Sequence, residues 1–460
     1  MKVGLLSLGR STFDVELANE KHKKIIKLLE NYSCEIIGSK ELLLDEEKTL
    51  IEIKNLKNNV PDYILILQIT FTDASVIHDI SIEFDLPISI WAIPEPRLGG
   101  RLRLNSFCGL NLASHTLGLN NINFNWLYKD LENVTNDDIS NLFNRALKKN
   151  NSFKELTKIT TLDGMEILKK INKFKIAKIG KRPDGFTTCD YNQNDIEKFC
   201  KIRVDEIKLE ELFKRSEETN STLIEDKISE ISKNISGLKK VDQKQLKKSV
   251  ALNFGLNKIK DDHFYDAFAI RCWPETFTKY GGAVCASVSL FSENKTPCAC
   301  EADVYGAITQ LILQTVSKSE VFLTDIVDIN NSDNTGVLWH CGQAPISMCD
   351  PDFIPRATVH TNRKMPLLFE FPLKEGEVTM MRISKGLGKL KMVISSGTIL
   401  KRDMAFTGTS GVIKFHNSSE IFLNNLIETG LEHHMAITYG NHKNLLVEVA
   451  SCMNLPAIEI

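Results

Sequence analysis

The stretch "TPCACEADVYGAITQLIL" (Thr296–Leu313) predicts a short strand followed directly by a buried helix. The residues before Glu301 form a short apolar run, and the apolar residues after it recur at helical spacing. Glu301 therefore falls at a strand-to-helix junction, where the positive end of the helix dipole favours a carboxylate. Because charged side chains are seldom fully buried without a partner, we expect Glu301 to have one at this junction.

A second acid ends the next predicted strand. The segment "EVFLTD" reaches Asp325 just before the polar loop "NNSDN". If the two strands are parallel, both carboxylates lie at the carboxyl edge of one sheet, where open α/β sheets bind ligands. Two convergent carboxylates can hold a hard divalent cation, or they can share acid and base duties on a substrate.

An ordinary structural explanation also fits these acids: Glu301 caps the helix and Asp325 is solvated. Asp303 and Asp328 are rivals for the same site. Asp303 falls in the first turn of the predicted helix, where carboxylates are common for dipole reasons alone. Asp328 lies three residues beyond Asp325.

Histidines supply the third component. The segment "GLEHHMAITYGNH" contains His433, His434 and His442, and "VLWHCGQAP" places His340 before a tight loop. Neighbours in a strand point to opposite faces, so only one of His433 and His434 is expected to point into a given site. Two carboxylates with a histidine suit manganese, with water or sugar oxygens as further ligands. A single histidine is otherwise a structural hydrogen-bonding residue.

The pattern along the chain predicts three domains. Residues 1–150 alternate strand and helix patterns, and residues 151–335 form a second α/β unit that carries the acidic pair. A Lys/Asn-rich segment lies near the first boundary. Residues 336–460 are predicted to be mostly antiparallel β, with a hairpin that turns at 385–388. The fold class is thus α/β, with two Rossmann-like doubly wound domains followed by a β-rich C-terminal domain.

Composition excludes several classes of protein. The net charge of −2 gives no electrostatic case for nucleic acid or an anionic membrane. Eleven cysteines without a CxxC pair indicate reduced thiols in the cytoplasm. The segment "MKVGLLSLGR" predicts a first strand rather than a signal peptide, and no apolar run approaches the roughly 20 residues that cross a bilayer. "LSLGRS" lacks the G-x-G-x-x-G pattern, so a dinucleotide site is not expected.

Four motifs carry a resemblance to a known family. "CACEADVYGAIT", "FLTDIVD", "WHCGQAP" and "GLEHHMAITYG" resemble segments of the L-fucose/L-arabinose isomerase superfamily, most strongly from Phe268 to the end. The resemblance implies two Rossmann-like domains and a C-terminal β domain. It also implies a homo-oligomer, a trimer or hexamer, with sites between subunits and a manganese or other divalent cation.

The resemblance implies roles for the acids and histidines. Glu301 and Asp325 match the acidic pair that binds the metal and serves as acid and base in the fucose branch. His434 matches the third ligand, with His433 as the alternative. His340 lies near the fourth ligand of the arabinose branch.

Two further motifs imply substrate contacts. "AIRCWPE" is similar to a segment that lines the sugar site, which makes Arg271 and Trp273 candidates. The positive charge of Arg271 would suit an anionic or more polar sugar; the alternative is a salt-bridged arginine beside a core tryptophan. "LNLASH" (Leu110–His115) resembles a substrate-contacting loop that a neighbouring subunit supplies, and the alternative for His115 is a surface loop residue.

The function implied is aldose–ketose isomerisation of a pentose, a 6-deoxyhexose or a related sugar through a metal-stabilised cis-enediol. The cation would polarise the carbonyl, Glu301 would remove the carbon-bound proton, and Asp325 would serve the hydroxyl protons. One alternative is an isomerase or epimerase of the same fold for an anionic sugar such as a sulfosugar. Another is a non-catalytic sugar-binding protein, which would have no need of Glu301, Asp325 and His434 together.

Overall fold

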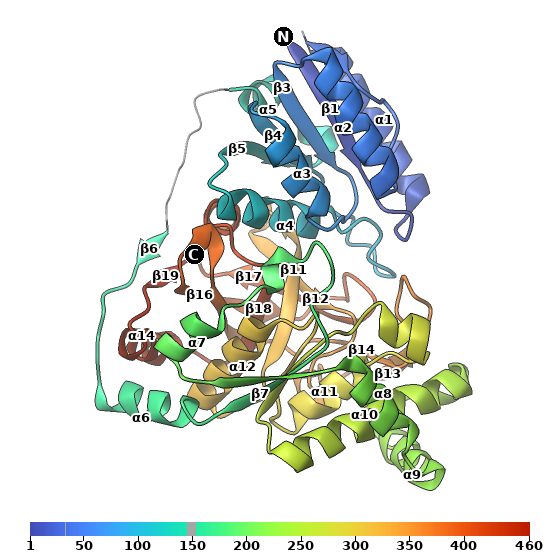
Figure 1. Cartoon of the computed structure of the whole chain (residues 1–460), viewed down its shortest axis with the longest axis vertical. Coiled ribbons are helices and arrows are strands. Elements are labelled where there is room, and N and C mark those ends of the chain that lie inside the picture. Colours follow the sequence, from blue (N-terminus) through green and yellow to red (C-terminus); the bar gives the residue numbers. More distant parts are fainter. Residues whose placement is uncertain (33, 145–152) are drawn as a thin grey trace.

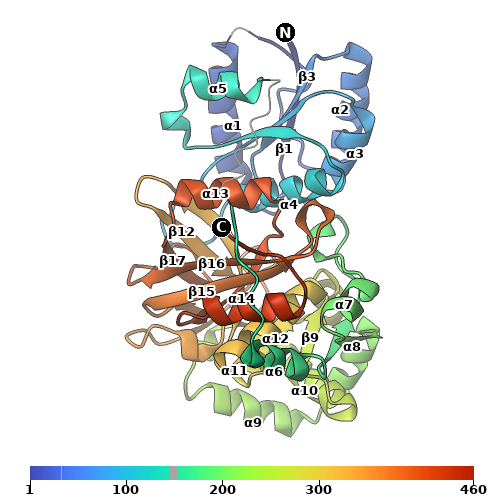
Figure 2. The same ribbon diagram turned by 90° about the vertical axis from the view of Figure 1, so that its left-hand side faces the viewer.

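Three sheets organise the part of the chain that this computed structural model describes, residues 1–32, 34–144 and 153–460. Two parallel α/β units lie toward opposite ends of the molecule, with a larger mixed sheet between them (Figures 1 and 2). The predicted fold class is therefore confirmed. The predicted boundary at residue 150 lies outside the described residues, and the limits of the three domains stay predictions.

The N-terminal unit is a five-stranded parallel sheet in the order β2-β1-β3-β4-β5. Its central strand β3 (Tyr63–Gln68) is buried along its whole length, as a continuous apolar run between two helical layers requires. Helices α1 and α5 pack on one face, and α2, α3 and α4 on the other. The remaining elements are β1 (Lys2–Leu8), β2 (Glu35–Ile37), β4 (Ile88–Ala92), β5 (Phe124–Tyr128), α1 (Val15–Glu30), α2 (Glu46–Asn59), α3 (Ser75–Glu83), α4 (Ser106–Leu119) and α5 (Asn136–Leu142).

The second unit is a four-stranded parallel sheet in the order β10-β9-β7-β8. The short strand β10 (Cys298–Ala299) leads into α12 (Val304–Ser317), which confirms the strand and helix predicted around Glu301. The remaining elements are β7 (Lys175–Ile179), β8 (Arg203–Ile207), β9 (Ala267–Ile270), α6 (Leu162–Ile171), α7 (Gln193–Phe199), α8 (Leu209–Glu217), α9 (Ser221–Ile231), α10 (Gln243–His263) and α11 (Cys285–Glu293).

The mixed sheet has ten strands in the order β13-β14-β17-β12-β11-β18-β15-β16-β19-β6. The predicted hairpin is confirmed as β15 (Gly376–Ser384) and β16 (Lys391–Leu400), which pair antiparallel. The remaining elements are β6 (Lys154–Glu155), β11 (Phe322–Asn330), β12 (Thr335–His340), β13 (Arg356–Thr358), β14 (Leu368–Pro372), β17 (Thr409–Phe415), β18 (His434–Tyr439), β19 (Ala457–Glu459), α13 (Ser419–Glu428) and α14 (Lys443–Cys452).

Strand β11, which carries Asp325, belongs to this mixed sheet. It pairs antiparallel with β12 and β18, whereas β10 pairs with β9 in the second parallel sheet. The expectation that Glu301 and Asp325 lie on parallel strands of one sheet is therefore wrong. The two acids approach each other from different sheets instead.

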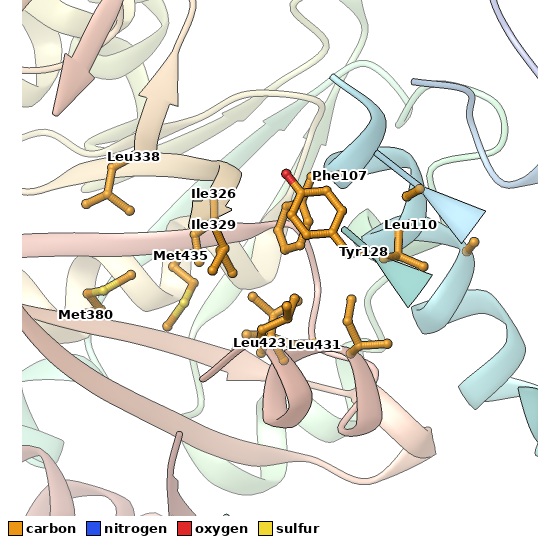
Figure 3. Close-up of a cluster of buried hydrophobic side chains, with 14 of the residues drawn as sticks. Phe107, Leu110, Tyr128, Ile326, Ile329, Leu338, Met380, Leu423, Leu431 and Met435 are labelled. Atoms are coloured by element: carbon orange, nitrogen blue, oxygen red, sulfur yellow. The ribbon is translucent and has the colours of Figure 1, made fainter. Parts of the chain in front are cut away.

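Helix α4 joins the N-terminal unit to the mixed sheet. Nearly all of its residues are buried, because it packs against its own sheet on one side and against β11 and α13 on the other. Figure 3 shows Phe107 and Leu110 of this helix in a cluster with Ile326 and Ile329 of β11. In the described ranges no helix combines the length and apolarity that a membrane crossing needs.

Candidate active site

A cavity of about 110 Å³ lies where the three sheets meet. Arg10 and Phe71 enter it from the loops after β1 and β3, where the strand order of the first sheet reverses. Trp273 and Glu301 come from the loops after β9 and β10, and Asp325 comes from β11. Ligands of open α/β sheets bind at such carboxyl edges.

Glu301 is free to act in the cavity because another acid caps the helix. Asp303 is the N-cap of α12, and its carboxylate accepts the backbone N–H of Gly306 at 2.8 Å. Glu301 and Ala302 adopt left-handed backbone conformations (φ 57° and 54°), which turn the chain between strand and helix. The explanation of Glu301 as a helix cap is therefore wrong.

The Glu301 carboxylate is held by two donors. Trp273 Nε1 donates to Oε1 at 3.0 Å, and His433 Nε2 lies 3.0 Å from Oε2. Burial alone would raise the pKa of Glu301, but the hydrogen bond from His433 and the charges of His433 and His434 outweigh it and lower the pKa to about 2. The side chain is thus ionised at neutral pH, as a metal ligand or a proton acceptor must be.

His434 presents one ring nitrogen to both acids. Its Nδ1 lies 2.8 Å from Asp303, so a proton at Nδ1 leaves the lone pair at Nε2. Nε2 lies 3.8 Å from Glu301 Oε2 and 3.6 Å from Asp325 Oδ1. A carboxylate that orients a histidine from behind is the usual support of a metal-binding imidazole.

Asp303 and Arg382 form a buried ion pair behind His434 that the sequence analysis did not predict. Arg382 is completely buried in β15 and donates to both carboxylate oxygens of Asp303, at 2.5 and 3.1 Å. A Cβ built at Gly306 would lie 2.5 Å from Asp303 Oδ2, so the glycine leaves room for this pair. The available signal in the sequence was an arginine between apolar residues in "TMMRIS" (Thr379–Ser384), because such a charge needs a buried partner.

Asp325 supplies an oxygen without a partner. It lies opposite His434 in the β11–β18 pair and is only 8% exposed, so it is not the solvated acid of the structural explanation. Among the described residues no donor reaches its buried Oδ1. A buried anionic oxygen without a donor, beside an imidazole lone pair and a second carboxylate, fits the oxygen and nitrogen ligand set of a divalent cation.

His433 and His434 both contact Glu301. Their rings lie 3.8 Å apart, and both Nε2 atoms approach Oε2 of Glu301. Only His433 is among the residues that line the cavity. Both rings nevertheless approach the same carboxylate, because β18 begins at His434 and strand alternation does not extend to His433. Burial lowers the pKa of His433, but its bond to Glu301 outweighs this effect and raises the pKa.

His340 lines the cavity at the end of β12. Its Nδ1 accepts the backbone N–H of Cys341 at 2.8 Å, and its Nε2 lies 3.0 Å from Cys300 Sγ. A neutral ring with Nδ1 as acceptor carries its proton at Nε2, so this geometry favours a hydrogen bond to Cys300 over a lone pair aimed at the acids. The ligand role of His340 stays a prediction.

The remaining predicted residues differ in their placement. Trp273 lines the cavity, whereas Arg271 is not among the lining residues. The guanidinium of Arg271 is held by Glu275 at 2.5 and 2.8 Å and by two backbone carbonyls. His115 lies in the buried helix α4, with Nδ1 2.7 Å from the carbonyl of Gly430, so the predicted loop is wrong. The substrate-binding roles of these residues stay predictions.

The rival residues lie outside the cavity lining. Asp328 pairs with Arg97 at 2.6 Å where the N-terminal unit meets β11. His442 Nε2 lies 2.9 Å from the carbonyl of Tyr439, near the start of α14. A larger cleft of about 1050 Å³ between the N-terminal unit and α13 contains neither Glu301 nor Asp325, both of which line the smaller cavity. The smaller cavity is therefore the candidate active site.

The fold and the cavity define an α/β enzyme with carboxylates and imidazoles positioned for a small polar substrate. Comparison with known families identifies the family to which the chain belongs. Residues 4–156 match the family described as fucose/sulfoquinovose isomerase, N-terminal domain, and residues 338–460 match L-fucose isomerase, C-terminal domain. The chain belongs to the L-fucose/L-arabinose isomerase superfamily as a divergent fucose isomerase-like member, and it is an isomerase.

Curated relatives extend over nearly the whole chain. The sulfoquinovose isomerase of Priestia megaterium is 29% identical over 449 residues, which cover 97% of this chain and 96% of the relative. Those of Alkalicoccus urumqiensis and Clostridium sp. (strain MSTE9) are 26% and 27% identical, and each alignment covers 99% of this chain and 98% of the relative.

Proposed function

We propose that this protein is a metal-dependent aldose–ketose isomerase whose substrate is a sulfonated hexose such as sulfoquinovose. The observation that carries the reaction class is that Glu301 and Asp325 line the cavity while Nε2 of His434, which is not itself a lining residue, approaches both carboxylates. The substrate rests on the names of the full-length relatives. Those names support the sulfosugar alternative better than a neutral pentose or 6-deoxyhexose.

The proposed metal ligands are Glu301, Asp325 and His434. A divalent cation bound there, with manganese as our proposal, would polarise the sugar carbonyl and stabilise negative charge on the oxygens of carbons 1 and 2. Glu301 takes the proton from carbon, for which its ionised state is required. Trp273 and His433 fix the direction of its oxygens. Asp325 exchanges the hydroxyl proton through its unpartnered Oδ1.

Asp303 offers a test of the metal proposal that does not depend on turnover. In Asp303→Asn we expect the dissociation constant for manganese to rise about 10- to 100-fold, because the carboxylate that orients His434 is lost. Equilibrium dialysis with metal analysis measures this constant. Asp333→Asn, which alters an exposed pair with Arg402, is the matched control and should bind like the wild type. Equal affinities in the two variants would contradict the ligand role of His434.

Proton exchange tests the function. Sulfoquinovose incubated with manganese-loaded protein in deuterated water should give the ketose with deuterium at carbon 1, as followed by NMR. Chelation should stop the reaction, and added manganese should restore it. Turnover of neutral aldoses alone would refute the sulfosugar proposal. Bound metal and bound sugar without exchange of any carbon-bound proton would indicate a sugar-binding protein instead.

Assembly and location are further proposals. A trimer or hexamer with sites between subunits rests on the superfamily resemblance, and light scattering in solution tests it. A cytoplasmic location is supported by the eleven cysteines, all of which are free thiols. Labelling of every cysteine in freshly unfolded protein tests that they are reduced.

A further inference from the structure

The cavity is also lined by a positively charged side chain, Arg363. Residues 360–363, in the loop between β13 and β14, line it together with Trp273 and Phe277. The loop is held by its own hydrogen bonds. His360 Nδ1 lies 3.3 and 3.4 Å from the backbone nitrogens of Asn362 and Arg363, and the backbone N–H of Lys364 donates to the His360 carbonyl at 2.7 Å. Arg363 is therefore presented from a fixed turn.

The guanidinium of Arg363 rests on two aromatic rings. It lies 4.7 Å from the ring centre of Trp273 and 5.3 Å from that of Phe277, and the side chain is half-buried. The guanidinium lies over the rings, and this contact does not use its N–H groups as donors to an oxygen, so they stay available to a ligand. An arginine in this position is preorganised to donate two parallel hydrogen bonds to a planar or tetrahedral oxyanion.

Arg363 differs from the neighbouring arginines because no carboxylate neutralises it. Arg10, which also lines the cavity, pairs with Asp73, and Arg271 pairs with Glu275. Among the described residues no acid forms an ion pair with Arg363. A half-buried positive charge that faces a cavity without a partner is suited to an anionic group of a ligand.

Trp273 contacts both Arg363 and the proposed base, Glu301. Its indole N–H holds Glu301 Oε1 at 3.0 Å, and the face of its ring carries Arg363. One rigid side chain therefore sets the separation between the proposed base and the positive charge. Sulfoquinovose carries its sulfonate on carbon 6, at the opposite end of the sugar from carbons 1 and 2. Attraction of the sulfonate to Arg363 therefore favours one orientation of the sugar.

We propose that Arg363 binds the sulfonate of the substrate and thereby determines the specificity of the enzyme for sulfosugars. This inference rests on the proposed function and adds the residue that recognises the negative charge of the substrate. The sequence suggested Arg271 as the residue that selects an anionic sugar, but its guanidinium is already bound to Glu275. The inference assigns that role to Arg363.

The test compares sulfoquinovose with quinovose, the neutral sugar that lacks the sulfonate. In Arg363→Gln we expect kcat/KM for sulfoquinovose to fall about 10- to 100-fold, mainly through KM, because one charged hydrogen-bonding group is lost. The value for quinovose should change by less than about threefold. Arg363→Lys should recover part of the loss, since lysine restores the positive charge but not the paired N–H donors of the guanidinium. Arg402→Gln, a surface arginine, is the matched control and should behave like the wild type.

Two results would overturn the inference. One is an equal loss for both sugars in Arg363→Gln, which would indicate a structural role. The other is selective loss of sulfoquinovose turnover in Arg271→Gln with Arg363→Gln unaffected.

A binding measurement separates this inference from the proposed function. If the wild type turns over no sulfosugar, the proposed function fails, and calorimetry with 2,3-dihydroxypropane-1-sulfonate then tests the anion site by itself. Binding to the wild type that is lost in Arg363→Gln would support the site. No binding to the wild type, or equal binding to both proteins, would refute it.

Discussion

Replacing Glu301 by glutamine is expected to lower kcat about 100- to 10,000-fold at saturating manganese and sugar. The amide has nearly the same shape, and it can still accept the Trp273 N–H, but it cannot take a proton from carbon. NMR in deuterated water measures both sugar conversion and exchange of the carbon-bound proton. Both should fall together, because proton removal precedes each of them.

The control for this variant is Glu230→Gln, which alters an exposed acid paired with Lys227 on the surface. It should retain wild-type kcat and the wild-type unfolding midpoint. Near-native turnover in Glu301→Gln would contradict the role of Glu301 as the base. If exchange persisted while conversion stopped, Glu301 would instead serve the hydroxyl protons, and Asp325 would become the candidate base.

Replacing Arg382 by methionine is expected to reduce the free energy of unfolding by about 3–5 kcal/mol, because it leaves a buried carboxylate without its partner. Arg382 is fully buried and neutralises Asp303, with Glu432 3.8 Å from its Nε. Urea unfolding of the metal-free protein, followed by fluorescence and circular dichroism, measures the change. The double variant Asp303→Asn/Arg382→Met should lose less than the sum of the single losses, since the two side chains interact.

Arg402→Met provides the comparison for a solvent-exposed ion pair. Arg402 pairs with Asp333 at the surface, so its loss should cost about 0–1 kcal/mol. If Arg382→Met were no more destabilising than Arg402→Met, the Asp303–Arg382 pair would not be a major stabilising interaction between α12 and β15. A matching loss of manganese affinity in Arg382→Met would show that the pair also positions His434.

The parts of the fold that follow from local pattern could be predicted from the sequence. Apolar runs such as Tyr63–Gln68 specify buried parallel strands, and the helical spacing after Glu301 specifies α12. The hairpin of β15 and β16 follows from alternation and the glycine-containing turn. Glu301 and Asp325 could be proposed as a convergent pair from the pattern, whereas the choice of His434 required a family resemblance.

The rest depends on contacts between distant segments, which local pattern does not contain. Asp325 belongs to the mixed sheet because β11 pairs with β12, which follows it directly, and with β18, more than 100 residues later in the chain. The partner of Asp303 is Arg382 on another strand, so its role beyond the helix cap was not visible locally. The choice between Arg271 and Arg363 depends on which arginine already has a carboxylate partner, and this follows only from the packed structure.

The pairing of β11 with β18 has a consequence for the order in which the molecule is completed. Until β18 is made, one edge of β11 has no neighbour, although both parallel sheets already have all of their strands. An unpaired strand edge is a site of aggregation, and pairing between distant segments is slow. We therefore expect the nascent chain to depend on chaperones at this stage, and activity to appear only after β18 has been made and has paired with β11.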